Sequence, residues 1–298
     1  MTQFNRKTLH STYAAATIAI ILWGFSFVWT NGLLNHEVPI FTFLFIRLSL
    51  AGLLLWIFSK VTGKLQKLTV KDFLFMCLMA FFEPFIYFIG ESFGMKATGS
   101  AVLAAVIIAT IPVFCMITER ILDKAPFTLY KIAGIFLTIP GIVLVVMKDG
   151  SLSVEHSYGI ALLFLAVTGA TGYAAVVKKL SGKYNSFTIA TYQFVLGALM
   201  FLPFFLLYGT EGLNATFFSA EVLIPLLSLA ALCSCVAFVL WVTAIRGLGI
   251  TRANIFSALI PAVSALGAAL MGQEDITVLT CAGIAIVITG VILAQQGK

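Results

Sequence analysis

The stretch TLYKIAGIFLTIPGIVL at residues 128–144 returns in altered form as TVLTCAGIAIVITGVIL at residues 277–293. The two stretches are 149 residues apart in a chain of 298 residues, so the second half of the chain repeats the first. The repeat extends upstream, because Pro112 and Pro261 occupy matched positions before the two stretches. One unit used twice within a membrane is typical of transporters.

The chain is far more apolar than a soluble protein. Hydrophobic residues make up 61% of it and charged residues only 10%, whereas a soluble domain has about 25% charged residues. Runs without any charge, such as 185–210, 222–245 and 253–273, are each long enough to cross the roughly 30 Å hydrocarbon layer as a helix. These runs lack polar helix faces, so they exclude a soluble helical protein and predict an all-α polytopic membrane protein.

Ten apolar segments predict ten transmembrane helices, five in each half of the chain. Their expected bounds are 12–33, 39–59, 73–94, 98–119, 128–147, 158–177, 187–208, 221–245, 252–272 and 276–295. The connections are short, so neighbouring spans are antiparallel and no linker can hold a soluble domain. We therefore expect two repeats, at residues 1–149 and 150–298.

The charges in the loops predict how the chain lies in the membrane. If the N-terminus is inside, most Lys and Arg residues fall in inside segments, and only Lys96 and Lys148 fall outside. Positive charge gathers on the cytoplasmic side, which places both termini in the cytoplasm and the protein in the cell membrane. Topology thus explains the net charge of +6 without a nucleic-acid partner. Because five spans is an odd number, the second half must be inverted relative to the first.

A series of short motifs runs through both halves. In the first half these are Leu22-Trp23-Gly24, Arg47 with Ala51-Gly52, and the 97–112 stretch that ends in Ile111-Pro112. In the second half these are Gly172-Tyr173, Gln193, Ala244-Ile245-Arg246, Ile260-Pro261, and Gly272-Gln273-Glu274 followed by Gly283 and Gly290. In this order and spacing, the motifs resemble the EamA-type family of the drug/metabolite transporter superfamily over essentially the whole chain.

The resemblance implies two inverted five-helix repeats around a central cavity. Spans one to four and six to nine would line the cavity, and spans five and ten would lie at the periphery. It also implies transport of small organic solutes such as amino acids, often outward, without a cofactor. The chain departs from the family pattern after span four, where Leu122-Asp123-Lys124-Ala125 replaces the frequent Gly-Glu pair, and in span three, where Glu83 and Glu91 are unusual.

Three charged residues inside predicted spans are the sharpest candidates for a binding site. An ionised group in a span costs about 2.5–3.5 kcal/mol unless it is paired or hydrated. Counting 1.5 Å per residue puts Arg47 near the depth of Glu83, and Glu91 much closer to the outer surface. We expect Arg47 to pair with Glu83 or to share one wet cavity with it. Arg47 would bind a substrate carboxylate and Glu83 an ammonium or a coupling proton, with a purely structural ion pair as the alternative.

Polar and aromatic residues complete the candidate substrate site. Gln193 is the second-half counterpart of Arg47 and suits either a ligand contact or a hydrogen bond between helices. Trp23, Tyr87 and Tyr173 lie in the middle of spans, where they line a cavity for amphipathic or cationic solutes or simply pack. Secondary candidates are Asn31, Asn254 and Ser257.

Proline and glycine residues recur at matched positions of the two halves. Pro112 and Pro261 each remove a helical hydrogen bond, which predicts kinks that serve either as gate pivots or in packing. The glycines of spans five and ten are Gly134, Gly141, Gly283 and Gly290. Each pair is seven residues apart on nearly one helix face, which favours close helix packing, with a homodimer interface through spans five and ten as the functional alternative.

The chain lacks the residues of a catalytic or metal site. His10, His36 and His156 are terminal or loop residues without a second metal ligand at suitable spacing. We therefore predict a secondary transporter of small metabolites that works by alternating access, and no enzyme. One alternative is proton-coupled efflux of cationic or amphipathic drugs, in which Glu83 exchanges protons for cations. An alternative of another class is a membrane-embedded lipid-modifying enzyme, which would need an acid/base or metal cluster that the loops lack.

Overall fold

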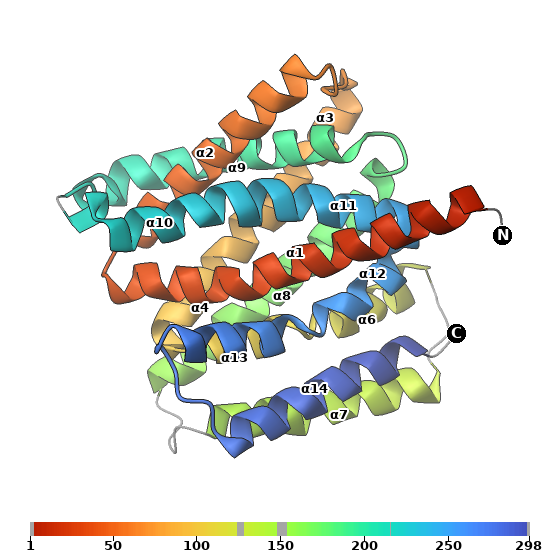
Figure 1. Ribbon diagram of the computed structural model, residues 1–298, viewed down its shortest axis with the longest axis vertical. Helices are drawn as coiled ribbons and strands as arrows, with labels where there is room; N and C mark the ends of the chain where they lie inside the picture. The colour runs from red at the N-terminus through yellow and green to blue at the C-terminus, as the bar shows by residue number, and fades with distance from the viewer. Residues whose placement is uncertain (1–2, 124–127, 148–153, 215, 297–298) are drawn as a thin grey trace.

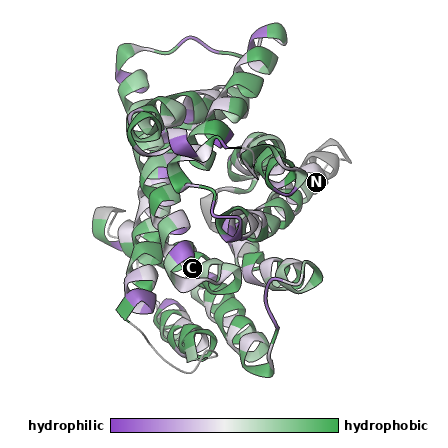
Figure 2. Cartoon of the chain, turned by 90° about the vertical axis from the view of Figure 1, so that its left-hand side faces the viewer, coloured by the Kyte–Doolittle hydropathy of each residue, from purple (hydrophilic) through white to green (hydrophobic). Residues whose placement is uncertain are grey.

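Helices make up all the regular secondary structure in the part of the chain that the computed structural model describes, residues 3–123, 128–147, 154–214 and 216–296 (Figure 1). Within the described residues, nine helical segments are long and apolar enough to cross a membrane: Ser11–Asn35, Ile40–Val61, Val70–Thr98, Ala101–Thr118, Leu129–Val146, Val154–Leu180, Ser186–Tyr208, Ala220–Leu248 and Val278–Gln296. A further apolar helix, Ile260–Leu270, is shorter. Figure 2 shows that apolar residues dominate the helices. The chain is an all-α, multi-pass membrane protein.

The two halves contain the same order of helices. The first half holds α1 (Gln3–Asn35), α2 (Ile40–Val61), α3 (Val70–Ala80), α4 (Tyr87–Thr98), α5 (Ala101–Ile108), α6 (Ile111–Asp123) and α7 (Leu129–Val146). The second half holds α8 (Val154–Leu180), α9 (Ser186–Tyr208), α10 (Ala220–Ser228), α11 (Ala237–Leu248), α12 (Ile250–Ser257), α13 (Ile260–Leu270) and α14 (Val278–Gln296). π-Helical segments, Phe81–Ile86 and Leu229–Val236, join α3 to α4 and α10 to α11, and short 3₁₀ turns lie at Thr210–Gly212 and Thr216–Phe218.

Proline breaks one span in each half at the same place. Pro112 and Pro261 are the second residues of α6 and α13. A proline ring clashes with the carbonyl group four residues earlier. Those earlier residues, Ile108 and Ser257, are the last residues of α5 and α12. The kinks expected at the two prolines are therefore complete helix breaks, and for this reason the predicted span 252–272 appears as two short helices.

Most of the helix packing joins one half of the chain to the other. Helix α1 packs on α11 and α13, α2 packs on α9, and α4 packs on α8. Helices α7 and α14 pack on each other at one edge of the molecule (Figure 1). The core is therefore shared, and its largest fully buried side chains include Phe27 and Phe43 from the first half and Phe194, Phe201 and Phe238 from the second. The predicted boundary between residues 149 and 150 lies outside the described residues.

The four glycines of the predicted peripheral spans lie at the contact between α7 and α14. A Cβ atom on Gly134 would lie 2.4 Å from the backbone nitrogen of Ala294, and one on Gly141 would lie 2.7 Å from Val287. Gly283 and Gly290 face Gly141 and Gly134 in return. Because these glycines let two helix backbones touch within one chain, a homodimer would have to use other faces of α7 and α14.

The connections α2–α3 and α8–α9 are tied together by polar contacts. The Asn185 side chain donates to the carbonyl of Lys64 at 2.7 Å. The Asp72 carboxylate accepts from Lys183 at 3.0 Å and from the Tyr184 hydroxyl at 2.8 Å. The hydrogen bond to Asp72 raises the pKa of Tyr184 above its ordinary value. These contacts join the two halves at the end of the molecule where α2 and α8 finish.

Candidate functional site

A cavity of about 80 Å³ lies between the two halves and holds three buried charged side chains. Arg47 comes from α2, Glu83 from the π-helical segment Phe81–Ile86, and Glu91 from α4. Their relative exposures are 2%, 7% and 4%. The cavity is also lined by Trp23, Ser26, Tyr87, Phe88, Tyr173, Phe238, Trp241, Asn254 and Ser257. Charged, aromatic and hydroxyl groups from both halves thus converge on one cavity.

Arg47 is held by two contacts, one from each half of the chain. Its Nε donates to the hydroxyl of Ser234 at 2.9 Å, and its guanidinium carbon lies 4.3 Å from the centre of the Phe88 ring. The ion pairs found among the described residues do not include one between Arg47 and Glu83. Of the two arrangements expected from the sequence, the structure therefore shows a shared cavity and not a direct pair.

Glu91 lies at this cavity, although counting residues along a straight helix placed it near the outer surface. Tyr87 and Glu91 are four residues apart in α4, so they share one face of that helix. The Tyr87 hydroxyl donates to Glu91 at 3.0 Å, which holds the carboxylate toward the interior. The cavity extends along α4 and reaches Glu91. The depth predicted for Glu91, closer to the outer surface than Glu83, stays a prediction.

The backbone around Glu83 is not regular. Glu83 has φ −147° and ψ 115° in the middle of the π-helical segment, and the buried Pro84 follows it. Proline cannot donate a backbone hydrogen bond, so the helix is interrupted there. π-Helical turns frequently accompany functional sites, and this one brings the Glu83 carboxylate to the cavity.

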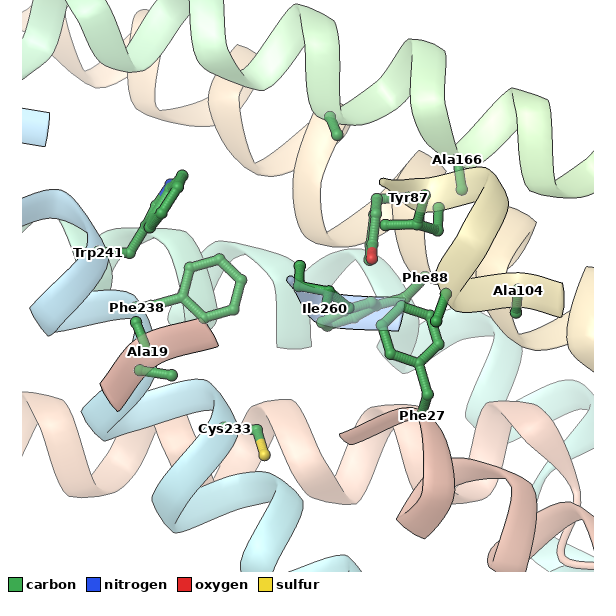
Figure 3. Close-up of a cluster of buried hydrophobic side chains, with 14 of the residues drawn as sticks. Ala19, Phe27, Tyr87, Phe88, Ala104, Ala166, Cys233, Phe238, Trp241 and Ile260 are labelled. Carbon is green, nitrogen blue, oxygen red and sulfur yellow. The ribbon is translucent and has the colours of Figure 1, made fainter. Parts of the chain in front are cut away.

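Aromatic rings form one wall of the cavity. The Trp23 ring centre lies 4.9 Å from that of Phe238 and 5.1 Å from that of Trp241. The Trp23 indole nitrogen donates to the carbonyl of Cys233 at 3.2 Å, which fixes the ring. In Figure 3, Phe238 and Trp241 lie on one side of Ile260, and Tyr87 and Phe88 lie on the other. The faces of such aromatic rings suit apolar or cationic groups.

Gln193 lies behind this wall and does not line the cavity. Its side chain is fully buried on α9, and its oxygen accepts from the Tyr173 hydroxyl at 3.3 Å. Its amide nitrogen has no hydrogen-bond partner among the described residues. Of the two roles expected for Gln193, the structure shows the hydrogen bond between helices, which joins α9 to Tyr173 of α8.

The secondary candidates are divided between two places. Asn254 and Ser257 line the cavity from α12. Asn31 lies away from it and donates to the Gln273 side chain at 3.2 Å. Sequence reasoning missed Ser234, Phe88 and Phe238 as parts of the site. The spacing of Phe238 from Trp241 and Ile245, which puts all three on one face of α11, was the signal available.

No group of His, Cys, Asp and Glu within the described residues has an arrangement that could hold a metal ion. The expectation that the site works without metal or cofactor stays a prediction. What the cavity offers chemically is a cation, two carboxylates and ring faces. Such groups bind and orient small charged solutes.

Comparison with known proteins identifies two matching units. The EamA-like transporter family matches residues 10–147 and 157–295. An uncharacterized transporter of Archaeoglobus fulgidus is 29% identical over 287 residues, which cover 95% of this chain and 96% of that protein. The uncharacterized transporter YetK of Bacillus subtilis is 24% identical over 299 residues, which cover 98% and 89%.

A solved crystal structure has a similar fold, with a TM-score of 0.72, 13% sequence identity and coverage of 96% of both chains. That likeness concerns the fold alone. The two family matches together span nearly the whole chain and fall on its two halves. The chain therefore belongs to the EamA-like transporter family of the drug/metabolite transporter superfamily.

Proposed function

We propose that this protein is a secondary transporter that moves small organic solutes, such as amino acids and related metabolites, across the cell membrane. Its family and the names of its relatives support transport as the function. The observation that carries the proposal is the convergence of Arg47, Glu83 and Glu91 with aromatic rings in one cavity between the halves. In this proposal the protein is not an enzyme and needs no cofactor.

The binding chemistry follows from the side chains of the cavity. The Arg47 guanidinium would bind a substrate carboxylate, because its planar donors match carboxylate geometry. Glu83 and Glu91 would bind an ammonium group or a coupling proton. The rings of Trp23 and Trp241 would contact the remainder of the solute. A zwitterionic amino acid satisfies both kinds of charge at once.

Alternating access would come from movement of the two halves around this cavity. We propose that the halves, residues 1–149 and 150–298, are inverted repeats of five spans each, with both termini in the cytoplasm. The matched breaks before Pro112 and Pro261 are places where the fourth and ninth spans can bend. Inverted repeats with a site at their interface are a common plan of secondary transporters.

A flux experiment tests this proposal. Purified protein in liposomes is offered a panel of radiolabelled amino acids and related metabolites, with and without a pH gradient. We expect saturable uptake of at least one solute, and we expect Glu83→Gln to lower it strongly. Glu211→Gln is the matched control, because Glu211 is an exposed loop carboxylate and the change should leave uptake unaltered. Absence of transport for every solute under both conditions would refute the proposal.

A second candidate, proton-coupled efflux of organic cations, is favoured by one observation. The cavity holds two carboxylates but one guanidinium, and aromatic rings that suit cations lie beside them. A cation would then compete with a proton for Glu83. If Glu83→Gln left drug resistance and pH-dependent cation flux untouched, this function would be excluded.

A further inference from the structure

A group of polar side chains joins the two halves beyond one end of the cavity. We name this group the clasp, and it consists of the side chains of Asn31, Ser100, Gln273 and Glu274 together with the backbone N–H of Val102. We infer that Glu274 latches the cavity shut at the end of the bundle where α1, α4 and α13 finish, and that the clasp must open before solute can pass there. This inference rests on the proposed alternating access.

Glu274 holds the start of α5. Its two carboxylate oxygens accept from the Ser100 hydroxyl at 2.8 Å and from the Val102 backbone N–H at 3.1 Å. The first N–H groups of a helix have no partner within the helix and attract negative charge. Hydrogen bonds to a carboxylate are about twice as strong as those between neutral groups. The loop after α13 is thereby fastened to the first half of the chain.

Gln273 fastens the same loop to α1. Its amide nitrogen donates to the carbonyl of Val28 at 3.0 Å, and its oxygen accepts from Asn31 at 3.2 Å. Gly272, with φ of 63°, adopts the left-handed conformation that ends α13 immediately before this pair. Two consecutive side chains therefore bind two different helices, so α1, α5 and α13 cannot separate at this end while both contacts persist.

The cavity is placed unevenly between the two ends of the bundle. At the clasp end, Leu33 of α1 and Met95 of α4 are fully buried. Toward the opposite end, the cavity lining includes Ile245, near the end of α11, and Asn254 of α12. The cavity thus reaches toward the end that lacks the clasp. This arrangement is that of a carrier closed at the clasp.

The repeat shows that the clasp belongs to one end only. The residues 149 positions away from Asn31, Ser100, Gln273 and Glu274 are Leu180, Gly249, Lys124 and Ala125. Leu180, Gly249 and Ala125 carry no polar side chain, so the repeat cannot form the same set of hydrogen bonds at the other end. The opposite end, where α2 and α8 finish, is joined by other contacts, those of Asp72 and Asn185. Opening at the clasp end therefore requires the loss of the Glu274 and Gln273 hydrogen bonds, which opening at the other end leaves in place.

Labelling of a cysteine in the cavity tests the latch without any knowledge of the substrate. Ser26→Cys places the probe on the cavity wall, in a chain whose five native cysteines are replaced by alanine. A membrane-impermeant maleimide is applied to intact cells and, separately, to inside-out vesicles. We expect Glu274→Gln to raise the labelling rate about tenfold in the preparation where the reagent reaches the clasp end of the protein. The reason is the loss of charge-assisted hydrogen bonds. Labelling from the opposite side should slow or stay constant.

Asp275→Asn is the matched control, because Asp275 is the exposed neighbouring carboxylate and the change should leave both rates within a factor of about two. Ser100→Ala, which removes one of the two contacts, should give an intermediate rate and serves if Glu274→Gln does not fold. Equal rates for Glu274→Gln and Asp275→Asn would overturn the latch, as would faster labelling from both sides. If the protein is not a transporter, solute flux will be absent although labelling still responds to Glu274→Gln. The failure of the proposed function can therefore be told apart from the failure of the latch.

Discussion

Arg47 connects the chemistry of the cavity to the contact between the two halves. Its Nε binds Ser234 of the second half, while Phe88 of the first half covers its guanidinium. The side chain is therefore oriented before any solute arrives. An oriented donor binds a carboxylate with less loss of conformational entropy than a mobile one.

Substitution of Arg47 separates its charge from its geometry. Arg47→Lys keeps the charge but loses the planar donor set and the contact with Ser234. We expect this change to weaken binding of a carboxylate-bearing solute about tenfold, which corresponds to about 1.4 kcal/mol. Arg47→Met leaves two carboxylates without their cation and should abolish transport and lower the melting temperature. Liposome flux and thermal unfolding in detergent measure the two effects.

Ser234→Ala provides the control for Arg47. It removes one hydrogen bond and keeps the charge of Arg47, so we expect the free energy of unfolding to fall by about 1 kcal/mol. Transport by Arg47→Met at the rate of the unaltered protein would show that the guanidinium does not bind the solute.

At the residue scale, the sequence predicted those site residues that conflict with their surroundings. Arg47 and Glu83 stand out because a charge within an apolar span needs an explanation. Ser234 and Phe238 are ordinary residues of an apolar span, so nothing in their type marks them. The sequence left two roles open for Gln193, because the rotation of α9 that turns it toward Tyr173 depends on packing across the whole bundle.

At the scale of elements, the pairing of α7 with α14 depends on the absence of side chains. Gly134→Ala would place a Cβ atom 2.4 Å from the Ala294 nitrogen, so the two backbones would have to separate. We expect a loss of stability of about 1–3 kcal/mol, as for other overpacked contacts. The measurement is thermal unfolding in detergent, monitored by the fraction of protein that stays monodisperse.

Gly182→Ala is the matched change for Gly134→Ala. The nearest atom to its new Cβ would be the carbonyl oxygen of Lys179 at 4.0 Å, so we expect no loss of stability. Equal stability of the two variants would mean that α7 and α14 are not in direct contact.

The two matched bends were the most predictable part of the fold. The matched prolines predicted where the helices bend, since the clash of a proline ring acts at a known distance along the chain. The count of spans was harder, because length and hydropathy cannot show that α12 and α13 are separated by two residues. The course of the cavity along α4 was also beyond sequence reasoning, since it depends on which faces of distant helices meet.

At the scale of the whole molecule, the two halves share one core. Because α1, α2, α4 and α7 all pack on helices of the second half, neither half can bury its polar groups alone. We expect residues 1–149 and 150–298, expressed as separate chains in one cell, to assemble and restore transport. Each half expressed alone should be degraded or aggregate. Co-purification through a tag on one half, followed by flux measurement, tests this expectation.

A matched experiment adds Gly134→Ala to the first half, and we expect the yield of the assembled complex to fall. Stable, monodisperse protein from one half on its own would contradict the shared core. The same result would also count against the idea that each half depends on the other when it moves.

The partition of charge between the halves has a consequence for biogenesis. Arg47, Glu83 and Glu91 all belong to the first half, whereas Ser234, the hydrogen-bond partner of Arg47, follows 187 residues later. At about 5–20 residues per second, the ribosome needs about 10–40 s to supply that partner. During this interval the nascent first half already contains both signs of charge. Its spans can thus enter the lipid phase with the charges neutralising one another, before the translocon has received the other half.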